Sequence, residues 1–191
     1  MENLPILDCD FFEKAEACYD PATVLGEDWN GTAIDILDHP QVPSEDKIWA
    51  VCAKGALPES TQRLMAVVFV RETPLHDGRN VVDLSTDGRS LKALEVAELH
   101  ALGRATDEEL DAARGAAKDA AMDAAGDVAA AATATWAAAR YSAWAASSAA
   151  AWDAAGSAAA AGDAAGAATW DAARDAQAEI ARRVILPNRA K

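Results

Sequence analysis

The chain has 191 residues, a formal net charge of −14 and a sequence pI near 4.5. This charge argues against direct binding to nucleic acid, because proteins that bind it present basic patches to the phosphates. The sequence has no run of about 18 strongly apolar residues, so we expect no membrane-spanning helix. The N-terminus Met1-Glu2-Asn3 lacks the basic region of a secretory signal, and the three cysteines lack a Cys-x-x-Cys spacing. We therefore expect a cytoplasmic protein with reduced thiols.

The negative charge is concentrated in the first 46 residues. They hold twelve acidic residues and one base, Lys14, whereas residues 47–103 are balanced and residues 104–191 carry −3. Two interpretations remain open: a solvated acidic face, or a surface that docks a basic protein, including one whose own ligand is nucleic acid. On the second interpretation, the predicted contact residues are Asp35, Asp38, Glu45 and Asp46.

Signals for helix starts predict several short helices in the first hundred residues. Asp10 with Glu13, and Thr32 with Asp35, have the spacing of an N-cap followed by an acid at the positive end of the helix dipole. Prolines at 21, 43 and 58 stand beside further capping residues and predict three more helix starts.

The following stretch, residues 73–89, carries the weakest signal. It contains one proline and two glycines, but 17 residues are long for a loop, so we expect a short helix or strand within it. Ser90 is then predicted to cap a helix that Gly103 ends. Thr106 and Glu109 have the spacing of a full capping box and predict the start of the next helix.

Alanine dominates the second half of the chain, with 37 alanines between Asp111 and Ala181. Alanine is the best helix former, and its small side chain lets helices approach closely. An acid or glycine recurs every four residues from Asp111 to Asp127, a period that drifts by about 40° per step on a straight helix. The tract therefore predicts several shorter helices, with breaks from Gly126 onward.

These patterns predict an all-α fold, in which a bundle of short N-terminal helices precedes closely packed alanine-rich helices. We divide the chain into an acidic-to-neutral helical region (1–103), an alanine- and tryptophan-rich helical region (104–183) and a C-terminal tail (184–191). In the second region, we interpret four tryptophans as large side chains that fill the space between alanine-faced helices. A pocket or an interface built from these tryptophans is the alternative. These residues are Trp136, Trp144, Trp152 and Trp170.

No catalytic or metal-binding motif occurs in the sequence. The three histidines are scattered, and there is no phosphate-binding glycine loop or HExxH motif. Either Cys18 or Cys52 would need a nearby histidine to act as a nucleophile. We expect no metal, no cofactor and no enzymatic activity.

Several segments resemble a group of alanine-rich helical proteins of phages and bacteria, some of them labelled immunity proteins of toxin–immunity systems. The similar segments are 33–40, 42–52, 90–98, 105–110, the alanine–tryptophan tract and 176–180. The resemblance implies an all-α fold and a phage or bacterial cytosol, and it carries no catalytic residues.

Three functions from different classes follow. The first is a protein-binding inhibitor, immunity or anti-defence factor that docks a basic partner through its acidic N-terminal surface. The second is a structural or self-associating helical protein, a homo-oligomer joined through alanine–tryptophan faces. The third is a helical protein that sequesters a small molecule.

Overall fold

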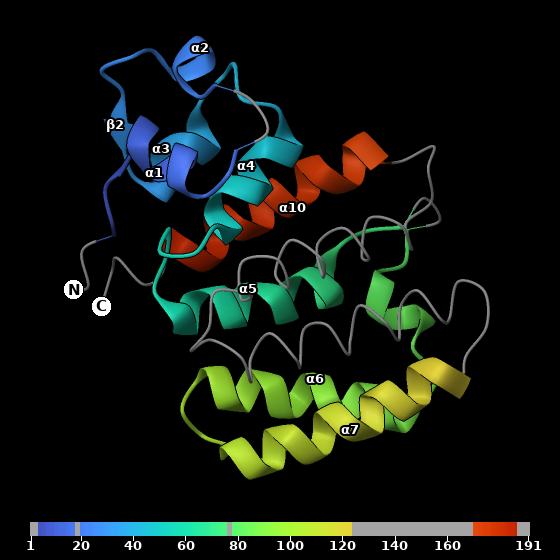
Figure 1. The fold of residues 1–191 in the computed structure, drawn as a ribbon. Coiled ribbons are helices and arrows are strands. Elements are labelled where there is room, and N and C mark those ends of the chain that lie inside the picture. Colours follow the sequence, from blue (N-terminus) through green and yellow to red (C-terminus); the bar gives the residue numbers. More distant parts are fainter. Residues whose placement is uncertain (1–3, 18–19, 76–77, 124–169, 187–191) are drawn as a thin grey trace.

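The computed structural model describes residues 4–17, 20–75, 78–123 and 170–186, and in these the fold is all-α, as predicted (Figure 1). A two-stranded antiparallel sheet accompanies the helices. The elements follow in chain order: β1 (Leu7–Asp8), α1 (Cys9–Lys14), α2 (Ala22–Leu25), β2 (Asn30–Gly31), α3 (Ala33–Asp38), α4 (Ser44–Cys52), α5 (Glu59–Glu72), the 3-10 helix η1 (Val81–Leu84), α6 (Gly88–Ala101), α7 (Asp107–Asp123) and α10 (Trp170–Ile185).

The predicted capping box at Thr106 and the predicted N-cap at Thr32 are confirmed, and the Thr32 cap is also a full capping box. At the start of α3, the Thr32 side chain and the Asp35 carboxylate each bond the other residue's backbone N–H. At the start of α7, Thr106 N–H donates to the Glu109 carboxylate at 2.9 Å, and Glu109 N–H donates to Thr106 Oγ1 at 3.2 Å. Both boxes satisfy N–H groups that have no partner within the helix.

Two other predicted caps are wrong by two or three residues. Helix α1 is capped by Asp8, whose Oδ1 accepts from Phe11 N–H at 2.7 Å, and not by Asp10. Helix α6 is capped by Asp87, whose Oδ1 accepts from Arg89 N–H at 2.8 Å, whereas Ser90 is buried inside the first turn. In α6 the burial of Ser90 leaves Asp87 as the cap. In α1 both Asp8 and Asp10 are exposed, and Asp8 caps because it stands three residues before the Phe11 N–H that it accepts from.

The small sheet was not predicted. Leu7 pairs with Gly31 and Asp8 with Asn30, and two residues per strand are too few to show an alternating pattern. A Cβ atom at Gly31 would lie 2.7 Å from the Trp29 ring, so the close approach of that ring requires glycine. In the stretch 73–89, η1 confirms the expectation of a short helix.

Helix α5 lies between α6 on one side and α10 on the other, and α10 also packs on α3 and α4 (Figure 1). Helices α6 and α7 form an antiparallel hairpin at the far side of α5. Buried residues from both sides of the predicted boundary at residue 103 belong to one hydrophobic core. Helix α10 extends to Ile185, which is buried, two residues into the predicted C-terminal tail.

The four-residue repeat lies on the solvent side of α7. Asp111, Gly115, Asp119 and Asp123 are exposed, whereas Leu110, Ala117 and Ala120 are buried. Gly126, where a break was predicted, and Asp127 lie outside the described residues. Alanine thus supplies the buried face of α7, and the repeated acids supply its solvated face.

Helices α1 and α6 end in the same hydrogen-bond pattern, a Schellman motif. In α1, Ala17 N–H donates to Phe12 C=O at 3.1 Å and Glu16 N–H donates to Glu13 C=O at 3.0 Å. The motif needs a left-handed residue, which is Gly103 in α6 (φ 68°) but Glu16 in α1 (φ 60°). A side chain in this conformation is strained, because Cβ crowds the carbonyl oxygen that follows.

We expect Glu16→Gly to raise the free energy of unfolding by about 0.5–1 kcal/mol, because relief of the strain outweighs the added freedom of the unfolded chain. The midpoint of urea unfolding measures this change. Glu16→Gln is the matched control, since it removes the same charge but keeps the side chain. Equal stabilisation by both variants would assign the effect to charge and contradict the prediction.

Candidate partner-binding surface

Asp35, one of the four predicted contact residues, is engaged in the cap of α3. Its Oδ2 accepts from Thr32 N–H at 2.6 Å and from the Thr32 hydroxyl at 2.7 Å. A carboxylate that accepts two such bonds at the positive end of a helix already has its main stabilising partners.

Asp38 and Glu45 pair with arginines of the C-terminal helix. Arg182 Nη2 lies 3.0 Å from an Asp38 carboxylate oxygen, and Arg174 forms an ion pair with Glu45. Next to the second pair, the Ser44 hydroxyl donates to the Asp175 carboxylate. Two arginines of α10 therefore pair with two of the four predicted contact residues.

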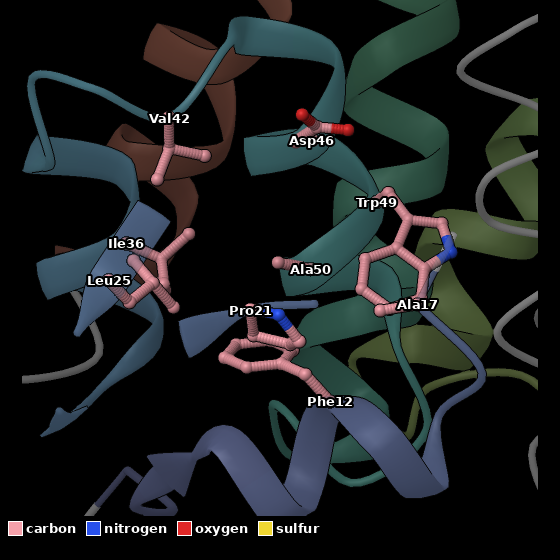
Figure 2. Close-up of a pocket in the computed structure, with 9 residues that line it drawn as sticks. All are labelled: Phe12, Ala17, Pro21, Leu25, Ile36, Val42, Asp46, Trp49 and Ala50. Atoms are coloured by element: carbon pink, nitrogen blue, oxygen red, sulfur yellow. The ribbon is translucent and has the colours of Figure 1, made fainter. Parts of the chain in front are cut away.

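Asp46, the fourth predicted residue, lies at the rim of a small pocket between α1, α2, α3 and α4 (Figure 2). The pocket has a volume of about 10 Å³, which accommodates about one water-sized group. Its walls are otherwise apolar and come from Phe12, Ala17, Pro21, Leu25, Ile36, Val42, Trp49 and Ala50.

A second set of acids, which sequence reasoning did not single out, surrounds α1 and α2. Five of them are exposed and form no ion pair with any residue that the structure describes: Asp10, Glu13, Glu16, Glu27 and Asp28. We call these five residues the α1–α2 acidic face. The only signal for it in the sequence was the low number of bases in residues 1–46.

The pKa of the Cys9 thiol reports the local negative field. Burial raises this pKa first, and the carboxylates of Asp20, Asp8, Glu13 and Asp10 raise it further. Each of these acids disfavours a thiolate at Cys9, so their charges act on a common region of space.

Three of the four tryptophans predicted as helix fillers or as a pocket or interface, Trp136, Trp144 and Trp152, lie outside the described residues. Of Trp170 the structure describes only its place as the first residue of α10. Two other tryptophans form the aromatic cluster of the described part. The Phe12 ring centroid lies 6.0 Å from that of Trp29 and 6.3 Å from that of Trp49.

Cys52 does not fit a nucleophilic role. Its side chain is fully buried, and burial raises the pKa of its thiol to about 12, so the thiolate is strongly disfavoured. Cys18, the other candidate, lies outside the described residues. Within the described ranges, no group of three or more His, Cys, Asp or Glu side chains is arranged to hold a metal ion.

None of the helices in the described part combines the length and apolar character needed to cross a membrane. Comparison with models of protein families, with curated proteins and with solved structures finds no match to this chain. The resemblance to alanine-rich phage and bacterial proteins stays an expectation.

The Asp38–Arg182 pair should couple α3 to α10. Both side chains are 42% exposed, so a double-mutant cycle of Asp38→Asn and Arg182→Met should give a coupling of about 0.2–1 kcal/mol in the free energy of unfolding. Raising the salt concentration should reduce this coupling. No coupling at low salt would show that the pair does not help to hold α10.

The buried Cys52 thiol should make stability fall at alkaline pH. The unfolded thiol ionises near pH 9.0 whereas the folded one has a pKa of about 12, so above pH 9 the unfolded state releases a proton that the native state keeps. The stability of the wild type relative to Cys52→Ala should then fall by about 1.4 kcal/mol per pH unit. Urea unfolding at several pH values under reducing conditions measures this slope.

Cys9→Ala is the control for that experiment, because Cys9 is only partly covered. We expect a much shallower slope for this variant relative to the wild type. A stability difference between the wild type and Cys52→Ala that stays constant from neutral to alkaline pH would contradict the prediction.

Proposed function

We propose that this chain is a non-enzymatic protein-binding module that docks a basic partner protein through the α1–α2 acidic face. The observation that carries the proposal is the contrast between two sets of acids. Asp35 bonds within its own cap and Asp38 and Glu45 pair with arginines of α10, whereas the five acids on and around α1 and α2 are exposed without a cationic partner among the described residues.

The charge at this face is costly for the isolated protein, because like charges repel. A basic partner relieves that repulsion, and long-range attraction raises the rate of encounter. The role that we propose is an inhibitor, immunity or anti-defence factor in a phage or bacterial cytosol. A partner whose own ligand is nucleic acid has the complementary charge, since its basic surface is shaped for phosphates.

Self-association is the second candidate function, and one observation favours it. Leu91 on α6 and Leu102, its C-cap residue, are 44% and 50% exposed, and eleven positions correspond to about three helical turns, which brings the two to nearly the same side. Light scattering over a dilution series tests this candidate, and a strict monomer excludes it. Sequestration of a small molecule at Trp136, Trp144 or Trp152 concerns residues outside the described part and stays a prediction.

The docking proposal predicts salt-sensitive capture of basic proteins from a bacterial lysate. Capture should be strong at about 0.1 M salt and lost at about 1 M, where the Debye length falls from about 10 Å to about 3 Å. The double variant Asp10→Asn/Glu13→Gln should bind about tenfold more weakly, if each acid contributes about 0.7 kcal/mol.

The matched control is Glu108→Gln/Asp119→Asn on α7. It also removes two exposed acids, one from the first turn of a helix and one from a later turn. The control should bind as the wild type does. Equal loss in both double variants would indicate a nonspecific effect of net charge, and no loss in either would contradict docking at the α1–α2 acidic face.

A further inference from the structure

We infer that the pocket in Figure 2 binds a primary alkylammonium group, the end of a lysine side chain. The part of this inference that assigns the ammonium group to a lysine of the basic partner rests on the proposed function. As a binding site for a small amine, it stands on the geometry of the pocket alone.

The pocket combines one carboxylate with aromatic walls. Asp46, Trp49 and Ala50 are spaced i, i+3 and i+4 on α4, so one face of this helix presents all three. Phe12 of α1 lines the opposite side, and Figure 2 shows Asp46 and the Phe12 ring at opposite ends of the pocket. A cation near such rings is attracted to their π electrons, and a carboxylate adds a charged hydrogen-bond acceptor.

The size of the pocket selects between the two basic side chains. A volume of about 10 Å³ accommodates one water-sized group, and an ammonium group has nearly the size of a water molecule. A guanidinium group is a wider plane with five N–H donors, and one carboxylate on an otherwise apolar wall leaves most of them without acceptors.

The charge around the pocket favours the same ligand. The α1–α2 acidic face belongs to the segments that supply Phe12 and Leu25 to the pocket, and its acids attract a cation before contact. A neutral apolar side chain would gain burial in the pocket but nothing from this field. Complementary charge therefore identifies a lysine of the basic partner, rather than an apolar residue, as the occupant.

The test uses the full chain labelled with ¹⁵N and follows the indole N–H signal of Trp49, assigned with Trp49→Phe, during titration with n-butylammonium chloride. We expect a saturable shift with half-saturation in the millimolar range. The neutral analogue n-butanol and the wider n-butylguanidinium should each bind at least tenfold more weakly. Equal binding of n-butanol, equal binding of n-butylguanidinium, or no saturable shift with n-butylammonium would overturn the inference.

Variants locate the site. Asp46→Asn should weaken n-butylammonium binding about tenfold, whereas the exposed-acid control Glu108→Gln should leave it unchanged. Unchanged binding in Asp46→Asn would overturn the role of this carboxylate. The comparison of the three ligands uses the wild-type chain, so the inference stays falsifiable even where Asp46→Asn fails to fold.

The two proposals fail separately. If n-butylammonium does not bind while Asp10→Asn/Glu13→Gln still loses the basic partner, the pocket inference is overturned and the docking proposal stands. If n-butylammonium binds but no basic protein is captured at low salt, the amine site stands and its role in docking is overturned.

Discussion

The attachment of α10 to α3, α4 and α5 is the interaction on which the rest of the structure depends. Its buried stripe consists of Ala173, Gln177, Ile180, Ala181 and Ile185, and its small alanines let the helix approach the N-terminal elements closely. Inside this contact, Gln177 Nε2 donates to Thr73 Oγ1 at 3.1 Å across 104 positions of the sequence. A buried amide without its partner would be costly, so this bond helps to set the position of α10 along α5.

The same attachment distributes the surface charge. Arg174, Arg182 and Arg183 flank the buried stripe and pair with Glu45, Asp38 and Glu72. In this way three arginines of the C-terminal helix pair with acids of other helices, and the acids around α1 and α2 keep no such partner among the described residues. A surface that combines this charge with a pocket lined by a carboxylate and aromatic rings suits a basic protein better than a nucleic acid or an apolar ligand.

Local chemistry made much of the fold predictable, and the failures have one common cause. The Thr32 cap and the Thr106–Glu109 box were found because a cap needs partners only three residues apart. Asp10 and Ser90 were wrong as caps because an aspartate stood two or three residues earlier in each case, and only the folded helix shows at which residue it begins. Asp35 illustrates the limit for the site as well. One residue served two predictions, a helix cap and a partner contact, and the structure shows it bonded within the cap.

The sequence by itself determined the all-α class, most helix starts and the concentration of negative charge near the N-terminus, because these depend on composition and on neighbours within a few residues. Only the tertiary structure decided which acids stay available. The ion pairs of Asp38 and Glu45 join residues 144 and 129 positions apart, and no local pattern encodes such contacts. It also formed the pocket, whose Phe12, Leu25, Ile36 and Trp49 come from four different helices. Ion pairs between distant helices and a pocket between four helices are properties of the packed chain, since they depend on which surfaces meet when the helices assemble.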